Sequence, residues 1–380
     1  MAGTEDWIVD IDYARLLDDK RRTDADPVIV KTWMDVISRR PSRSGSEDPE
    51  DDDLEGLAHA FIDRLFHGGE DLTRKDFWPT LIRMAGCIPP RHPEACIMFH
   101  VFKTLEAREV ETYEERHAAE VESARAGAAI PNSGKTSLGM HVREAWDFSP
   151  LHFTTQLNLD NDAELFQFKR DFDLGEWFNL NAFLSKMWGK EHDPNTSMEL
   201  FAFWELRNAL EQPDIYPLQQ DDFARRVMEA RVRVACVWIK LSGARLLRDC
   251  LLSTHSEQPG EREGDPFRGG PMLPERGFSV ERWAFWKRIL RNLRATRYAD
   301  ADDASDDRPA EIFGTFPGQE PHFRSYKNYK GINVYGTPAT GQLIETTLER
   351  MNKDEREVAD LVNWSLKLDK RRKGDLEFWI

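Results

Sequence analysis

The length, composition and charge of the chain exclude several protein classes before any motif is considered. Its 380 residues are 40% hydrophobic and include 12 tryptophans and 22 phenylalanines, so long stretches can bury enough apolar area to offset chain entropy. The formal net charge of -16 argues against nucleic acid and anionic membranes as partners, because both attract basic surfaces. The sequence therefore predicts a folded protein that binds neither.

The N-terminal residues and the cysteines indicate a compartment. No run of about eighteen apolar residues is present, and residues 1–20 lack the basic and apolar regions of a signal peptide. Cys87, Cys96, Cys236 and Cys250 are sparse and lie in apolar helical patterns, which favours reduced thiols over disulfides. We expect a soluble cytoplasmic protein, with the nucleus as a second location.

Hydrophobic periodicity predicts the secondary structure. Apolar residues recur at three- and four-residue spacing along most of the chain, and alternating β-branched runs are nearly absent. We expect an all-α fold, an irregular multi-helix array with a buried tryptophan-rich central core, acidic linkers and a helical C-terminal tail. The pattern predicts helices at residues 7–21, 27–38, 54–67, 74–85, 93–126, 176–189, 198–211, 221–252, 280–297, 341–351 and 354–368.

Three stretches interrupt this periodicity. Residues 40–53 combine proline, serines and an acidic run, residues 253–276 are rich in proline and glycine, and residues 300–337 begin with an acidic segment that is rich in aspartate. Such compositions do not pack into a core. The predicted organisation is an N-terminal helical segment at 1–39, an acidic linker at 40–53, a helical core domain at 54–299, an acidic then Gly/Tyr-rich linker at 300–337 and a C-terminal helical segment at 338–380.

Residues 129–136 match the loosest spelling of a phosphate-binding P-loop, Ala-Ile-Pro-Asn-Ser-Gly-Lys-Thr. In a P-loop this stretch follows a buried strand and opens a helix, so that backbone N–H groups and the lysine converge on phosphate. Here a charged helical pattern precedes the stretch, which favours an ordinary helix break. We expect no nucleotide at Lys135.

Two further patterns suggest metals, and each has a simpler interpretation. The run Asp302-Asp303-Ala-Ser-Asp306 is similar to the magnesium-binding carboxylates of all-α terpene synthases, but it lies in an acidic low-complexity stretch without the partner motif. His92, Cys96 and His100 share one helix face, but a fourth ligand is missing and the neighbours are core residues. We predict neither a metal nor a cofactor.

The common enzyme motifs are absent from the sequence. It contains no Gly-x-Ser-x-Gly elbow, no dinucleotide fingerprint and no His-Glu-x-x-His helix. The basic cluster at residues 370–373 fits a nuclear import signal, although basic residues also complement the dipole at a helix C-terminus, which is the simpler interpretation. Without a complete catalytic set, the sequence favours a protein that is not an enzyme.

The predicted helices at 176–189 and 198–211 are apolar nearly all round and therefore belong in a core. Polar residues inside them need partners there or must face a cavity. We expect the guanidinium of Arg207 to lie near this core and to pair with Glu211 or Glu281. The candidate ligand pocket or buried polar network consists of Asn181, Arg207, Glu211, Trp238, Lys240, Glu281, Arg282, Trp283 and Trp286.

Four blocks of the sequence resemble a known family. They are Trp177-Phe-Asn-Leu-Asn-Ala-Phe183, Leu206-Arg-Asn-Ala-Leu-Glu211, Ala235-Cys-Val-Trp-Ile239 and Gly277-Phe-Ser-Val-Glu-Arg-Trp-Ala-Phe-Trp-Lys287. Their order and spacing resemble the fungal family catalogued as domain of unknown function 3632. The resemblance implies an α-helical fold and a filamentous-fungal source. That family has no established activity, so the resemblance implies no catalytic residues.

Two functions remain open at this stage. The first is a non-catalytic binding or scaffold protein with a protein partner, in which the polar residues bury one another. The alternative is an enzyme or ligand-binding protein of fungal secondary metabolism that takes a hydrophobic small molecule, with Arg207 or Lys240 holding an anionic group. Its apolar pocket would be lined by Trp177, Trp204, Trp238, Trp283 or Trp286.

Overall fold

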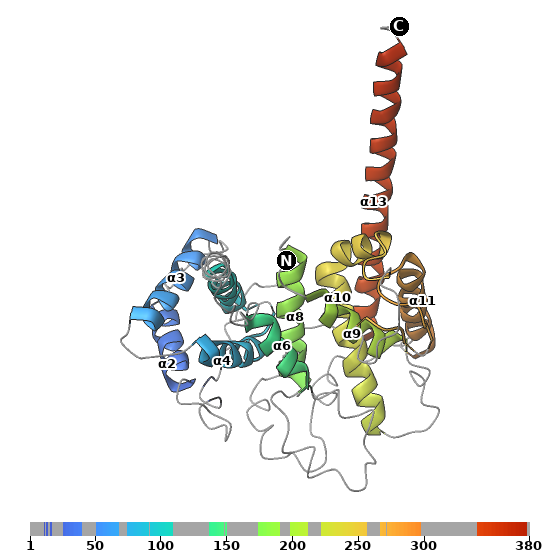
Figure 1. The fold of residues 1–380 in the computed structure, drawn as a ribbon. Helices are drawn as coiled ribbons and strands as arrows, with labels where there is room; N and C mark the ends of the chain where they lie inside the picture. Colours follow the sequence, from blue (N-terminus) through green and yellow to red (C-terminus); the bar gives the residue numbers. More distant parts are fainter. Residues whose placement is uncertain are drawn as a thin grey trace, which may run out of the picture. The chain divides into compact units, whose positions relative to one another are not determined.

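The computed structural model describes residues 26–39, 51–67, 74–90, 92–108, 137–147, 174–190, 198–211, 222–256, 267–270, 272–297 and 340–377, together with Ile11, Tyr13, Leu16 and Ser149. Every regular element in these ranges is a helix (Figure 1), which confirms the predicted all-α fold. Within the same ranges, no helix is both long enough and apolar enough to cross a membrane.

The helices belong to two compact units. The first unit comprises residues 1–187, 193–197 and 324–336, and the second comprises residues 188–192, 198–323 and 337–380. The boundary thus falls inside the range 54–299, for which the sequence suggests one core domain. The predicted domain limits stay a prediction.

Aromatic side chains form the core of the first unit. Trp33 lies edge-on to Phe61, with ring centroids 5.2 Å apart, and Trp146 lies edge-on to Trp177 at 4.5 Å. Because large rings remove much apolar area from water, these pairs hold the helices together. The elements are α2 (Asp26–Ile37), α3 (Asp51–His67), α4 (Arg74–Cys87), a helix at residues 93–108, α6 (Ser137–Asp147) and most of α8 (Leu174–Lys190).

The second unit contains α9 (Met198–Leu210), α10 (Asp222–Leu251), α11 (Val280–Arg297) and α13 (Thr340–Glu377). Helix α10 is kinked at Ser242, whose hydroxyl donates to the carbonyl of Trp238 at 2.7 Å. At the next residue, Gly243, a Cβ atom would lie 2.4 Å from a carboxylate oxygen of Asp354. Glycine therefore permits the close approach of α13 to α10.

Three helices differ from the periodicity prediction. Helix α6 is absent from the prediction, although Leu138, Val142 and Trp146 form a buried stripe at helical spacing. The predicted helices 341–351 and 354–368 are one helix, because neither glycine nor proline separates them. Helix α3 begins within the predicted acidic linker, and acidic residues in a first turn suit the helix dipole.

Several sequence motifs cannot be placed. The P-loop-like residues 129–136, the aspartates at 302–306 and most of the predicted helix 7–21 lie outside the described residues. For the predicted helix 93–126, the structure describes residues up to 108, and these are helical. The backbone of the basic residues 370–373 is part of helix α13.

Candidate functional site

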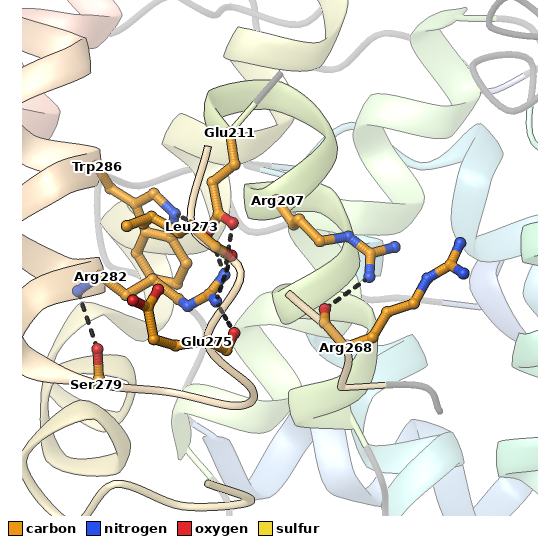
Figure 2. Close-up of polar contacts among 8 residues, drawn as sticks. All are labelled: Arg207, Glu211, Arg268, Leu273, Glu275, Ser279, Arg282 and Trp286. Atoms are coloured by element: carbon orange, nitrogen blue, oxygen red, sulfur yellow. Dashed lines mark hydrogen bonds and ion pairs between the residues drawn. The ribbon is translucent and has the colours of Figure 1, made fainter. Parts of the chain in front are cut away.

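The main polar cluster of the second unit surrounds Glu211, directly after α9 (Figure 2). Its carboxylate accepts hydrogen bonds from Nη1 of Arg282, at 2.6 and 2.5 Å, and from Nε1 of Trp286 at 2.7 Å. The exposed fraction is 1% for the Arg282 side chain and 0% for that of Glu211. This is therefore a fully buried ion pair with an indole as a third partner, an arrangement in which each charge compensates the other.

Arg282 owes its position to the start of α11. The Oγ of Ser279 accepts a hydrogen bond from the backbone N–H of Arg282 at 3.1 Å and so caps the start of the helix. Nη2 of Arg282 donates to the carbonyls of Leu273, at 3.3 Å, and Glu275. One guanidinium thus connects the end of α9, the loop at 272–276 and the first turn of α11.

The electrostatics of Glu211 reflect its burial. Burial raises the pKa of Glu211, while the charge of Arg282 and the hydrogen bond from Trp286 act in the opposite direction. The guanidinium of Arg282 also lies over the Phe203 ring, 4.9 Å from its centre. The guanidinium of Arg282 thus contacts a carboxylate, two backbone carbonyls and an aromatic ring.

The structure corrects the expectation for Arg207. Its side chain is half-buried, and Nη1 donates to the carbonyl of Arg268 at 3.0 Å. The carboxylate of Glu211 binds Arg282 instead, because α11 brings that guanidinium into the core at the point where α9 ends. Burial lowers the pKa of Arg207, and the charge of Arg282 lowers it further while that of Glu211 raises it, so Arg207 remains an electrostatic neighbour of the ion pair.

Other predicted site residues lie apart from this cluster. Glu281 is exposed and so does not belong to a buried network. Trp283 donates through Nε1 to Glu355 of α13 at 2.9 Å, and Lys240 donates to Oγ1 of Thr346 at 3.4 Å. These contacts connect α13 to α11 and to α10.

Two of the predicted residues are core residues. Trp238 is fully buried and lies edge-on to Trp188, with ring centroids 6.1 Å apart. Asn181, in the first unit, donates to the carbonyl of Trp177 at 2.9 Å within its own helix. Of the nine predicted candidates, the structure joins Glu211, Arg282 and Trp286 by hydrogen bonds.

A buried cluster in the first unit was missed by the sequence analysis. Oε2 of Glu94 accepts hydrogen bonds from the hydroxyl of Tyr13 and from Nε1 of Trp33, the latter at 3.2 Å. Burial, together with the charge of Glu94, raises the pKa of Tyr13 well above its ordinary value. Glu94 lies in the first turn of a helix between His92 and Cys96, and no spacing rule relates it to Tyr13, which is 81 residues away.

The histidine and cysteine residues considered as metal ligands have protein partners. Nδ1 of His92 accepts a hydrogen bond from the backbone N–H of Glu94 at 3.3 Å, and Sγ of Cys96 accepts one from Lys186 at 3.4 Å. His100 lies edge-on to Phe99. In the described part of the chain, no group of three or more His, Cys, Asp or Glu side chains is arranged to hold a metal ion.

A comparison with protein families identifies the chain. The model of a family described as "Protein of unknown function (DUF3632)" matches residues 78–290, which is more than half of the chain. The chain belongs to the DUF3632 family. The matched range includes Glu211, Arg282 and Trp286, and membership confirms the resemblance seen in the four sequence blocks. Comparison with curated proteins and with solved structures found no match.

Proposed function

We propose that this DUF3632 protein is a non-catalytic binding protein whose helical core is closed and whose partner binds at its surface. The observation that supports the proposal is the mutual burial of Glu211, Arg282 and Trp286. A ligand site would direct such groups into a largely apolar cavity, with their hydrogen bonds left for the ligand. Here Glu211 accepts hydrogen bonds from Arg282 and Trp286, and Arg282 also donates to the carbonyls of residues 273 and 275.

The contacts of α13 further support a rigid scaffold. Lys287 and Trp283 of α11 both donate to the carboxylate of Glu355, and the Lys287 bond is 2.5 Å long. On α10, Arg233 donates to Oγ1 of Thr340 at 3.1 Å. Polar bonds at several points along one helix fix its register against its neighbours.

The proposed setting is the cytoplasm or nucleus of a fungal cell. The four cysteines are free thiols, as proteins of a reducing compartment usually have. Burial raises the pKa of Cys236 to about 12 and also raises the pKa of Cys250, so both thiols stay protonated and unreactive.

The alternative, a small-molecule enzyme or ligand-binding protein, needs an aromatic-lined pocket. Of the tryptophans considered for that pocket, Trp177, Trp238 and Trp286 are fully buried. Nε1 of Trp286 donates a hydrogen bond to Glu211, and the ring of Trp177 packs against Trp146. These contacts favour a packing role over a lining role.

One experiment separates the two functions without presupposing a substrate. Purified full-length protein is incubated with the small-molecule extract of a strain that lacks the gene, and all metabolites are followed over time by mass spectrometry. For a binding protein, we expect no metabolite to change by more than the molar amount of protein added. Conversion through many turnovers, absent from a heat-inactivated control, would overturn the proposal.

A second experiment tests for the partner itself. The tagged full-length protein is crosslinked in cells, and each candidate partner is then purified separately and mixed with it. We expect one complex of fixed stoichiometry to re-form from the two pure components and to coelute in gel filtration. If no candidate re-forms a complex, the binding function is wrong.

A further inference from the structure

Two arginines, Arg207 and Arg268, lie beside the Glu211 cluster and do not belong to its buried ion pair. Arg207 lies in the last turn of α9, and Arg268 lies on the neighbouring loop at residues 267–270. Figure 2 shows both guanidiniums on the same side of the loop, and it shows the bond from the Arg207 guanidinium to the backbone carbonyl of Arg268. Burial lowers the pKa of Arg207, and the nearby charge of Arg268 lowers it further.

Among the described residues at this place, positive charges outnumber negative ones. Glu211 is a carboxylate whose charge acts on Arg207, and its oxygens already accept bonds from Arg282 and Trp286. Among the residues that the structure describes, no carboxylate forms an ion pair with Arg207 or Arg268. The described charges that act on Arg207 are therefore two guanidiniums, those of Arg268 and Arg282, and one carboxylate, that of Glu211, in a chain whose net charge is -16.

The loop that carries Arg268 is held in place on both sides. Phe267 stacks on the ring of His255, with centroids 3.8 Å apart, and packs against Phe203 at 5.5 Å. On the other side of Arg268, a Cβ atom at Gly270 would lie 2.8 Å from a Glu211 oxygen and 3.1 Å from Cγ of Arg207. The two arginines are thus attached to a preorganised surface, which reduces the entropy lost when a ligand binds.

We propose that Arg207 and Arg268 form a binding site for a phosphate monoester group carried by a phosphorylated side chain of the partner protein. This inference rests on the proposed binding function and adds the chemistry of the partner. A phosphate monoester carries close to two negative charges and three acceptor oxygens, so it matches two guanidiniums better than a single carboxylate does. The acidic chain as a whole disfavours a nucleic acid as the source of that phosphate.

The test measures the affinity of the full-length protein for inorganic phosphate by calorimetry, with chloride at matched ionic strength as the reference. Its main variant is Arg268→Ala, which removes an exposed side chain and keeps the carbonyl that Arg207 binds. The matched control is Arg288→Ala, since Arg288 is also exposed and lies over an aromatic ring, 5.0 Å from the centre of Phe285.

We expect phosphate to bind the wild type and Arg288→Ala equally and to bind Arg268→Ala at least about tenfold more weakly, because a charged hydrogen bond is lost. Without phosphate, Arg268→Ala should melt at the same temperature as the wild type or higher, since a like charge near Arg207 is gone. Equal phosphate binding by the wild type and Arg268→Ala would overturn the site. The site would also be overturned if the wild type bound phosphate no more tightly than chloride, which is the result expected when a carboxylate of the chain itself binds the two guanidiniums.

A second arm tests the source of the phosphate. A degenerate phosphoserine peptide library is passed over immobilised wild type and Arg268→Ala, with the unphosphorylated library as control. Retention of phosphorylated peptides by the wild type alone supports a protein partner, whereas binding of inorganic phosphate without any peptide retention overturns that assignment. These outcomes are separate from the metabolite experiment, in which turnover would overturn the binding function and leave the phosphate site standing.

Discussion

Each unit of the molecule contains a buried glutamate that accepts a hydrogen bond from a tryptophan, and the two differ in the second donor. In the first unit, Glu94 is bound by Trp33 and by the neutral hydroxyl of Tyr13. In the second unit, Glu211 is bound by Trp286 and by the cation Arg282. Both arrangements give the carboxylate two donor residues, but only the second places two opposite charges together in the core.

This difference changes what each cluster contributes to stability. When a buried ion pair loses one partner, the other charge remains in a medium of low dielectric, and the cost is large. When a neutral donor is lost, the cost is that of an unsatisfied hydrogen-bonding group, which is smaller. The comparison therefore predicts a graded series of mutational effects.

The largest effect is expected for Arg282→Ala. It leaves the Glu211 carboxylate buried without its cation, and breaking such a pair costs about 3 to 5 kcal/mol in unfolding free energy. The measurement is urea denaturation at pH 7, with Arg288→Ala as an exposed control. The double variant Glu211→Leu, Arg282→Met should recover much of the loss. If Arg282→Ala alone lowers the free energy of unfolding by less than about 1 kcal/mol, the ion pair does not have a central structural role.

A smaller effect is expected for Glu94→Ala. It leaves the hydroxyl of Tyr13 and Nε1 of Trp33 without their acceptor, which costs about 2 kcal/mol. Glu94→Gln should lose less, because both bonds end on a single oxygen that glutamine also provides. Denaturation gives the free energies.

Thiol labelling tests whether this second loss is confined to the first unit. The half-buried Cys87 and Cys96 report on the first unit, and the buried Cys236 and Cys250 report on the second. Glu94→Ala should speed the labelling of Cys87 and Cys96 alone. Equal acceleration at all four cysteines would show that the two clusters are not independent.

A pH-dependent effect of about 1 kcal/mol or less is expected for Lys287→Ala, since its partner Glu355 is partly exposed. Partial burial raises the pKa of Glu355, but hydrogen bonds from Lys287 and Trp283 and the charge of Lys287 outweigh it, so the net pKa is lowered. A carboxylate with a lowered folded pKa contributes stability above its unfolded value of 4.5 and loses it as the pH falls through the folded pKa. The difference between wild type and Lys287→Ala, measured by denaturation from pH 7 to 3, should therefore shrink below about pH 4.5. A difference that stays constant over this range would contradict the assignment.

The smallest effect is expected for Arg207→Ala. The guanidinium is half-buried and bonds to one carbonyl, and its removal also takes away a like charge near Arg282 and Arg268. We expect a loss of about 0.5 kcal/mol or none, in the same denaturation assay. A loss as large as that of Arg282→Ala would mean that the two arginines share the structural role, which would break the comparison.

The sequence by itself determined the features that depend on local interactions. The predicted helix at 280–297 has the bounds of α11, and the predicted helix at 198–211 differs from α9 by one residue. Periodicity and the Ser279 cap suffice there, because a helix is stabilised by contacts three and four residues apart. The family resemblance likewise rested on local blocks.

Only the tertiary structure decided which polar groups meet. The sequence offered Arg207 as the partner of Glu211, one helical turn away, yet Arg282 binds it across 71 residues. The Glu94 cluster is a second example, since Tyr13 meets it across 81 residues. Helical spacing states which side chains share a face, but it does not state which other helix packs on that face. The choice between two arginines of identical chemistry depends on where α11 enters the core, and that position results from the packing of many side chains at once.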